Sequence, residues 1–147
     1  MTKDIYKVPD NVKLNSLMSK EEYENLYDQS IKNPEKFWSE QAIRYLDWDS
    51  KWTNVKQEDF LKGEVRWFEN AKINASKNCI DRHLKNNGNK PAIIWEGDDP
   101  QLSKTITYTE LHEEVCKLSN VLKQRGVKKG DRVCIYMPMI PEAAYSM

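Results

Sequence analysis

The segment "KTITYTELHEEVCKLSNVLKQRGVKKGDRVCIYM", residues 104–137, decides the fold class. Thr107 and Glu110 have the spacing of a helix capping box. The apolar residues behind that box recur at helical spacing and predict an amphipathic helix: Leu111, Val115, Leu118 and Leu122. Gly126 ends this helix, and the apolar run that follows it, "RVCIYM" (132–137), is typical of a strand covered on both faces in a mostly parallel sheet. The order of strand, helix and strand predicts the opening of an α/β unit.

The residues on either side of this segment extend the pattern. "PAIIWEG" (91–97) and "KTITY" (104–108) predict two strands of a hairpin, joined by the polar connection "DDPQLS" (98–103). Beyond it, Pro141 is well placed to begin another helix, yet "PEAAYSM" is shorter than the ~12 residues an isolated helix needs. A strand at 132–137 also needs neighbours. We therefore expect the chain to be the front of a longer protein.

The first half of the chain has a different character. Residues 1–18 show no clear period and are expected to form an extended arm. Ser19 and Glu22 form a capping box at the start of a helix that continues to about residue 31. Asn33 and Pro34 mark the start of a second helix, whose inner face is expected to carry Phe37, Ala42, Tyr45 and Leu46. From residue 48 to 68 the pattern is irregular, with short extended pieces.

A third helix is expected before the hairpin. Asn74 or Ser76 can cap it, it continues to about residue 85, and "NNG" (86–88) ends it. The boundaries that follow are an arm at 1–18, a helical extension at 19–89 and the start of an α/β domain at 90–147.

Composition limits the classes of function. Charged residues reach 31%, hydrophobic residues 39%, and the formal net charge is zero. A chain without net charge has no global field to recruit nucleic acid or anionic lipid. No apolar run approaches the roughly 20 residues that span a bilayer, and the start lacks a secretory signal. We expect a cytoplasmic protein with no nucleic-acid or membrane partner.

The positions of the cysteines and tryptophans give two further expectations. Cys79, Cys116 and Cys134 are an odd number and include no CxxC pair, so we expect buried or half-buried free thiols. Four of the five tryptophans lie between residues 38 and 67. Because such rings bury large areas, the first half is expected to have an aromatic core or docking surface of its own.

One short stretch, "NCIDRH" (78–83), has the residue types of a reactive site. Cys79 and His83 share a helix face at i and i+4, which suits a metal ligand pair or a nucleophile and its base. Structural zinc needs four ligands, and a nucleophile pair needs a third, orienting group. The favoured interpretation is that Cys79 packs inward, while Asp81, Arg82 and His83 make local hydrogen bonds.

Three further stretches have a functional and a structural interpretation. Glu96, Asp98 and Asp99 could hold Mg²⁺, but they lie where a hairpin needs turn-forming residues. "GVKKGDR" (126–132) could attract phosphate but lacks the P-loop spacing, and a helix stop with a tight turn accounts for its glycines. "DWDSKW" (47–52) could form a cation cage, although interior packing is favoured.

Several strings together resemble one family. "LYDQSIKNPEKFWSEQA", "LDWDSKW", "DFLKGEVRWFENAKINASKNCIDRHL", "AIIWEGD", "TYTEL", "GVKKGDRV" and "IYMPMIPEAA" are similar to the N-terminal region of AMP-forming acetyl-CoA synthetases, from about residue 19 to the end. "TYTEL" followed by "GD-V" belongs to the wider adenylate-forming superfamily. "NCIDRH", "IWEGD" and "IYMPMIPEA" are more specific and favour acetate, with propionyl-CoA synthetases as the near neighbour.

The resemblance implies an acetate–CoA ligase that uses ATP, Mg²⁺ and CoA and forms acetyl-adenylate before acetyl-CoA. It also implies a helical, Trp-rich extension at 19–89, followed at 90–147 by the first hairpin and β-α-β elements of the AMP-binding domain. The family's phosphate loop, nucleotide contacts, acetate pocket and catalytic lysine have no match in these residues. No catalytic, cofactor-binding or metal-binding residue can therefore be assigned.

Two hypotheses follow for the chain itself. The first is the N-terminal portion of an acetate–CoA ligase that is inactive alone, binds no cofactor by itself and has the remainder of the synthetase as partner. The alternative is a non-catalytic interaction module that docks onto a partner chain through its aromatic residues.

Overall fold

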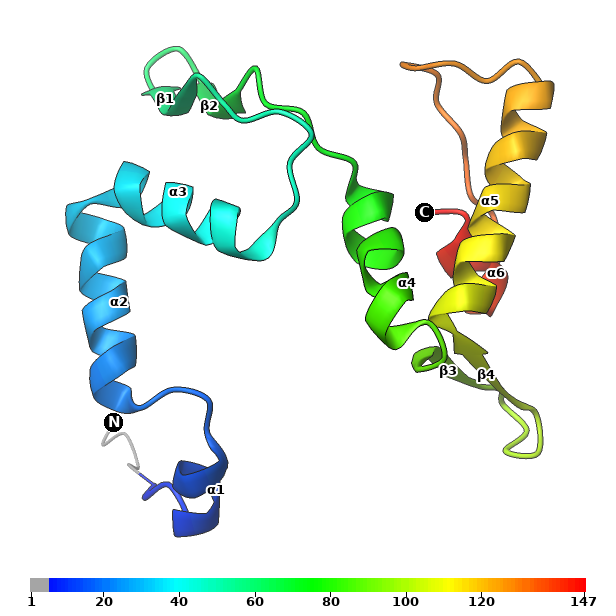
Figure 1. Ribbon diagram of the computed structural model, residues 1–147, viewed down its shortest axis with the longest axis horizontal. Coiled ribbons are helices and arrows are strands. Elements are labelled where there is room, and N and C mark those ends of the chain that lie inside the picture. The colour runs from blue at the N-terminus through cyan, green and yellow to red at the C-terminus, as the bar shows by residue number, and fades with distance from the viewer. Residues whose placement is uncertain (1–5) are drawn as a thin grey trace. The chain divides into compact units, whose positions relative to one another are not determined.

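The computed structural model describes residues 6–147, and the chain divides after Ile73 into two compact units. The elements of unit 1 are α1 (Asp10–Asn15), α2 (Lys20–Lys32), α3 (Pro34–Tyr45), β1 (Asn54–Asp59) and β2 (Glu64–Glu69), shown from blue to green in Figure 1. Those of unit 2 (Asn74–Met147) are the π-helical turn η1 (Lys77–Asp81), α4 (Arg82–Asn87), β3 (Pro91–Glu96), β4 (Ser103–Thr107), α5 (Tyr108–Gln124) and α6 (Pro141–Tyr145).

The starts of α2 and α3 are those that the sequence predicts. The Ser19 hydroxyl accepts from the Glu22 amide at 3.1 Å, and the Glu22 carboxylate accepts from the Ser19 amide at 2.7 Å. This backbone hydrogen bond lowers the pKa of Glu22, because it stabilises the charged carboxylate. α3 begins with Pro34 at its first position. Both helices are therefore defined by local chemistry at their N-termini.

Three expectations for unit 1 need correction. A short helix, α1, lies within the segment expected to be an extended arm, whose residues 1–5 are outside the described part of the chain. Tyr45 and Leu46 are exposed, whereas Ala42 is buried, because α3 ends at Tyr45 and the backbone of Leu46 is already extended. The segment expected to be irregular contains an antiparallel hairpin of β1 and β2.

The β1–β2 hairpin carries the aromatic cluster of unit 1. Its turn uses the Asp59 carboxylate, which accepts from the Leu61 and Lys62 amides, and Gly63 at φ 68°. Beside the sheet, the ring centroids of Trp48, Trp52 and Phe68 lie 4.7–5.2 Å apart. The Trp48 indole donates to the Ala42 carbonyl oxygen at 2.9 Å and ties this cluster to α3.

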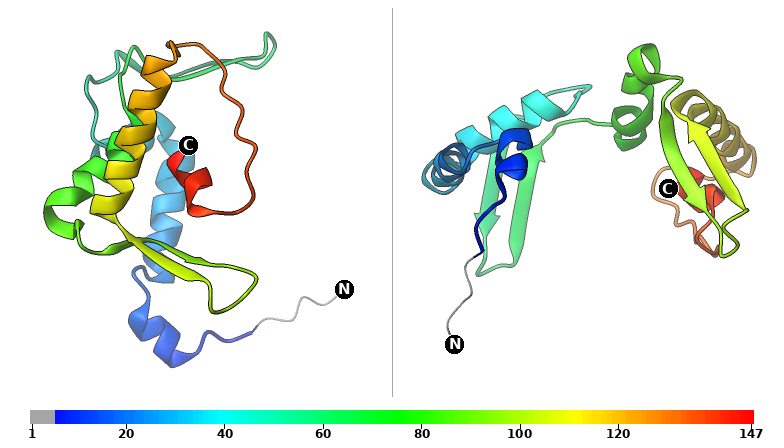
Figure 2. Two further views of the ribbon diagram at one scale, coloured as in Figure 1. Left: turned by 90° about the vertical axis from the view of Figure 1, so that its right-hand side faces the viewer. Right: turned by 90° about the horizontal axis from the view of Figure 1, so that it is seen from below.

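Unit 2 contains the hairpin and long helix that decide the fold class. β3 and β4 pair antiparallel, with Ile93 opposite Ile106. The Thr107 hydroxyl accepts from the Glu110 amide at 3.2 Å, and the Glu110 carboxylate accepts from the Thr107 amide at 2.8 Å, so the predicted capping box starts α5. Figure 2 shows α6 beside α5, and the two helices are in contact.

The core of unit 2 is small. Ile80 of η1, Ile106 of β4 and Leu111 of α5 are its buried members, and Ile106 is only 2% exposed. Partly buried residues surround them: Ala92, Ile93, Val115 and Tyr145. Burial raises the pKa of the Tyr145 hydroxyl. Because η1 packs on α5, the structural division lies at residue 73, earlier in the chain than the boundary expected between 89 and 90.

The expected strand at 132–137 does not form among the described residues. Residues 131–138 have no regular structure, and the side chains of 131–139 are exposed, Tyr136 to 98%. The two ends of this segment are nevertheless fixed: the turn at 128–131 holds one end, and the Trp95 indole donates to the Met139 carbonyl oxygen at 2.7 Å near the other. A strand needs a partner ladder, and the described residues supply none for this segment. The β-α-β order is therefore present only as β4, α5 and an unpaired segment.

Candidate functional site

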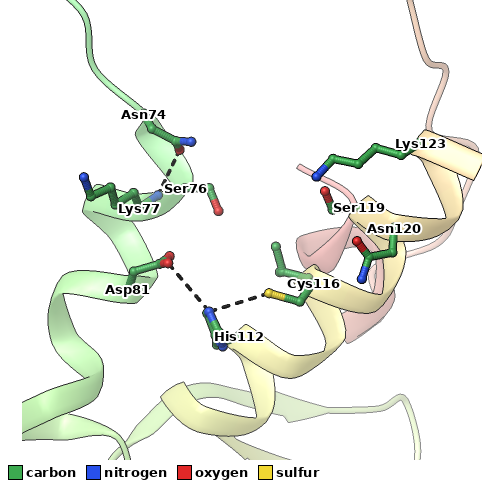
Figure 3. A pocket seen from close by; sticks show the side chains of 10 residues that line it. Asn74, Ser76, Lys77, Asp81, His112, Cys116, Ser119, Asn120 and Lys123 are labelled. Atoms are coloured by element: carbon green, nitrogen blue, oxygen red, sulfur yellow. Dashed lines mark hydrogen bonds and ion pairs between the residues drawn. The ribbon is translucent and has the colours of Figure 1, made fainter. Parts of the chain in front are cut away.

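The site with the most chemically reactive side chains lies in unit 2, in a cavity of about 350 Å³ between residues 74–81 and α5 (Figure 3). Three side chains meet there: the Asp81 carboxylate, the His112 imidazole and the Cys116 thiol. Asn74, Ser76, Ser119, Asn120 and Lys123 also line the cavity. Asp81 comes from the π-helical turn, whereas His112 and Cys116 come from one face of α5. Tertiary packing therefore assembles the site.

Local hydrogen bonds fix the helical segment that carries Asp81. The Asn74 side-chain oxygen accepts from the Lys77 amide at 3.0 Å and caps the segment, as one of the two predicted caps. Asn78 is buried, and its side-chain amide donates to the Asn74 carbonyl oxygen at 3.0 Å. Arg82 in turn donates to the Asn78 side-chain oxygen at 3.2 Å. These contacts set the position of Asp81, about two turns beyond the cap.

His112 and Cys116 are placed by the start of α5. The capping box at Thr107 fixes the first turn of the helix, so residues i and i+4 within it share a face. His112 Nε2 lies 3.6 Å from Cys116 Sγ and 3.6 Å from Asp81 Oδ1. Figure 3 shows both contacts converging on the imidazole.

The geometry excludes one catalytic arrangement. In a nucleophile–His–carboxylate triad, the two partners use different ring nitrogens, so that the carboxylate orients the ring while the other nitrogen takes the proton. Here Asp81 and Cys116 approach the same nitrogen, Nε2. Asp81 can act as a counter-ion to a charged His112, but it cannot orient the ring from the opposite side. The side chains of His112 and Asp81 are 34% and 45% exposed, so solvent also screens their attraction.

The cluster also does not form a metal centre. Residues 6–147 contain no group of three or more His, Cys, Asp or Glu side chains that could hold a metal ion. The acidic residues of the β3–β4 connection form the expected turn: the Asp99 carboxylate accepts from the Gln101 amide at 3.0 Å, and the Gly97 amide donates to the Leu102 carbonyl oxygen at 2.8 Å. The turn interpretation is confirmed for Asp98 and Asp99, which lie in the connection, whereas Glu96 is the last residue of β3 and pairs with Ser103.

The stretch at 78–83 does not behave as predicted throughout. Cys79 is exposed rather than packed inward, because Asn78 and Ile80 occupy the buried face of the π-helical turn. His83 packs its ring on Tyr108, with centroids 5.3 Å apart. Asp81 finds its partner on α5 instead of locally.

All three thiols, Cys79, Cys116 and Cys134, are exposed, so the prediction of buried or half-buried cysteines is wrong. Cys116 lies on the polar face of α5, and Cys134 lies in the unpaired segment. His112 and Cys116 are the thiol–imidazole pair that forms a contact. Their sequence signal was present, because they have the same i, i+4 spacing as Cys79 and His83.

The remaining two stretches have the structural roles that were favoured. Gly126 has φ 84° and follows α5, and Gly130 has φ 97° in the next turn, where the Asp131 carboxylate accepts from the Lys128 amide at 2.7 Å. Both glycines thus occupy the left-handed region that a helix stop and a tight turn require. In "DWDSKW" both tryptophans pack on Phe68.

Comparison with protein families divides the chain at nearly the same place as its structure. Residues 23–79 match the family model for the acetyl-coenzyme A synthetase N-terminus, and residues 80–147 match that for AMP-binding enzymes. Together the two matches extend from α2 to the last residue.

Individual relatives agree with these matches. The chain is 55% identical to the acetyl-coenzyme A synthetase of Alkalilimnicola ehrlichii and 56% identical to that of Magnetococcus marinus, in each case over 97% of this chain and 22% of the relative. An acetoacetyl-CoA synthetase from Streptomyces lividans has a similar structure, with a TM-score of 0.75 and 26% identity over 84% of this chain and 19% of that one.

Proposed function

The chain belongs to the acetyl-coenzyme A synthetase family, whose N-terminal portion it matches, and we propose that it serves as the N-terminal scaffold of an acetate–CoA ligase. One observation carries this proposal: the match extends over 97% of the chain at 55% identity. The chain spans about a fifth of the length of the relatives it matches, 22% in the same comparison. The activity of the whole enzyme is therefore part of the proposal.

The proposed reaction has two steps. The acetate carboxylate attacks ATP, with Mg²⁺ as the metal, to give acetyl-adenylate and pyrophosphate, and the CoA thiol then displaces AMP to give acetyl-CoA. Adenylyl chemistry depends on positioned charges around the phosphates. In residues 6–147, the Asp81–His112–Cys116 cluster lacks a triad geometry, and no three-ligand group fits a metal ion. We assign none of these steps to a residue of this chain.

Uncovered apolar surface supports a scaffold role. The chain has a mass of 17.3 kDa and an accessible surface of 13020 Å², whereas two separate compact bodies of half that mass expose about 9,400 Å² together. Ile94, Tyr136 and Met139 are among its large exposed apolar side chains. Exposed apolar side chains together with this excess of total surface favour further polypeptide as a covering partner, and we propose the remainder of the synthetase for that role.

The two units have separate parts in this proposal. The Trp-rich extension is expected at 19–89 and the start of the AMP-binding domain at 90–147. We propose that the boundary between them along the chain lies earlier, near the structural division at residue 73. The packing of η1 and α4 on α5 supports this earlier boundary.

None of the described helices is both long and apolar enough to traverse a bilayer. We propose a cytoplasmic enzyme, and no observation favours the alternative of a stand-alone interaction module.

A chimera tests the proposal. The N-terminal portion of the Alkalilimnicola ehrlichii enzyme that matches this chain is replaced by residues 1–147, and acetate-dependent exchange between ATP and pyrophosphate is measured. We expect exchange in the chimera and none in the relative from which this portion has been deleted. A chimera that is folded, as judged by its circular dichroism, but lacks exchange would overturn the proposal.

A further inference from the structure

The cluster around His112 has a property that the proposed scaffold role does not use. Cys116 is exposed, its Sγ lies 3.6 Å from His112 Nε2, and the same nitrogen lies 3.6 Å from Asp81 Oδ1. The ring nitrogen is close enough to take the thiol proton as the sulfur attacks, which is the role of a base beside a nucleophile. A carboxylate beside the imidazole stabilises the charge that the ring gains with the proton. The three groups therefore have the arrangement of a reactive thiol, although not of a catalytic triad.

The other two thiols provide an internal comparison. Within residues 6–147, no hydrogen bond or ion pair involves the side chain of Cys79 or Cys134. Cys79 lines a mainly apolar depression with Ile80 and Ala92. All three thiols are exposed, so exposure alone does not distinguish Cys116. Its neighbours do.

The cavity next to Cys116 also has features that suit a small anionic reagent. Its volume of about 350 Å³ lies within the range of small-molecule pockets. Ser119, Asn120 and Lys123 follow Cys116 along the same face of α5. Figure 3 shows the Lys123 side chain extending into the space between the two helical segments. An ammonium group there can attract a carboxylate of a molecule whose reactive atom lies at Cys116.

We propose that Cys116 is a site of reversible thiol modification that undergoes exchange with small disulfides carrying carboxylate groups. This inference goes beyond the proposed function and does not depend on it. The cluster assigns one task to each member: Cys116 is the attacking thiol, His112 exchanges the proton, and Asp81 is the counter-ion of the charged His112 ring. Lys123 selects for negative charge in the reagent.

The exchange balances without a further oxidant. The Cys116 S–H proton passes to His112 Nε2, and the sulfur attacks one sulfur of the disulfide R–S–S–R. The S–S bond of the reagent breaks as the new Cys116 S–S–R bond forms. The departing R–S⁻ takes the proton from His112 and leaves as R–SH. Cys116 is oxidised, one sulfur of the reagent is reduced, and a second thiol reverses the step.

The test uses the whole 147-residue chain and glutathione disulfide as the probe. Peptide mapping by mass spectrometry measures the rate of mixed-disulfide formation at Cys116, Cys79 and Cys134 in the same sample. We expect Cys116 to react at least about tenfold faster than the other two, since a positioned base contributes tenfold or more to such a step. In urea this advantage should disappear, because unfolding separates His112 and Asp81 from the thiol.

Two substitutions assign the advantage to the cluster. His112→Gln should lower the Cys116 rate to that of Cys79, while the Cys79 rate itself stays unchanged. Asp81→Asn should lower it by about two- to fivefold, as expected for a half-exposed ion pair.

Lys123 is tested with a pair of reagents. Lys123→Gln should slow the reaction with glutathione disulfide and leave the reaction with the neutral hydroxyethyl disulfide unchanged. Lys117→Gln is the matched control, because Lys117 lies on the same helix but pairs with Glu114 at 2.7 Å, and it should change neither rate.

Two results would overturn the proposal. Equal rates at the three thiols in the native chain would show that the cluster does not activate Cys116. An unchanged Cys116 rate in His112→Gln would show that the imidazole takes no part. The urea comparison uses the unmodified chain, so it distinguishes these outcomes even where a variant fails to fold.

Discussion

Truncation of Ile106 offers the most sensitive test of how unit 2 is held together. This side chain is 2% exposed and packs with Ile80 and Leu111 in the only cluster of buried apolar residues in the described part of unit 2. Ile106→Ala removes three carbon groups, worth about 2.4 kcal/mol at about 0.8 kcal/mol each. The space that remains adds to this loss, so we expect a total of about 3 kcal/mol.

Amide hydrogen exchange over β4 and α5 measures this loss directly. If exchange follows the opening of the unit, a loss of about 3 kcal/mol accelerates it about 150-fold. Ile106→Val should accelerate it about fivefold, because one carbon group costs about 1 kcal/mol, and this variant keeps the test informative if the alanine variant unfolds.

The neighbouring strand of the same hairpin provides the control. Ile94 lies on β3 and is 77% exposed. The substitution Ile94→Ala should cost no more than about 0.5 kcal/mol. Equal effects of the two alanine substitutions would refute the assignment of Ile106 to the core and of Ile94 to an open face.

Three further predictions concern the caps and the aromatic cluster. Thr107→Ala removes the acceptor for the Glu110 amide, which lies 3.2 Å away, and should cost about 1 kcal/mol, measured as faster amide exchange in the first turn of α5. The Thr107 amide lowers the pKa of the Glu110 carboxyl, so this contact stabilises the fold above the usual glutamate pKa of about 4.3 and is lost as the pH falls through the lower folded value. As the pH falls below the usual glutamate pKa, the free energy of unfolding should therefore decrease more in the parent chain than in Glu110→Gln, because the glutamine does not titrate. Urea unfolding at a series of pH values measures the difference. Trp48→Phe removes the hydrogen bond to the Ala42 carbonyl and should cost about 1 kcal/mol in the urea unfolding of unit 1, whereas Trp52→Phe, which lacks such a bond in the described structure, should cost less.

Features that depend on local chemistry could be predicted from the sequence. The two capping boxes, the proline starts of α3 and α6 and the glycine turns after α5 each depend on residues within one or two turns of one another. The β3–β4 hairpin belongs to the same group, because its strands are rich in β-branched and aromatic residues and its connection contains turn-forming residues. These elements include most of unit 2.

Features that depend on distant partners could not be predicted in the same way. The β1 and β2 strands, "NVKQED" and "EVRWFE", are rich in charged residues, so their pairing has little signal in the hydrophobic pattern. The segment 132–137 has a strong strand pattern, yet no described strand lies beside it to complete a ladder. Propensity gives the preference of a segment, whereas a strand also requires a neighbour.

The candidate site shows the same limit. The i, i+4 spacing of His112 and Cys116 is visible in the sequence, but the same spacing occurs at Cys79 and His83, where no thiol–imidazole contact forms in the described structure. What distinguishes the two pairs is Asp81, which reaches His112 from another helix through packing on α5. No local pattern encodes that approach.

The proposed role of this chain is to supply scaffold, and no chemistry, to an acetate–CoA ligase. Acetate-dependent ATP–pyrophosphate exchange, measured side by side for the isolated chain and for the chimera that carries it, tests this role most directly. We expect exchange by the chimera and none above the protein-free blank for residues 1–147 alone. Exchange by the isolated chain would contradict the scaffold role.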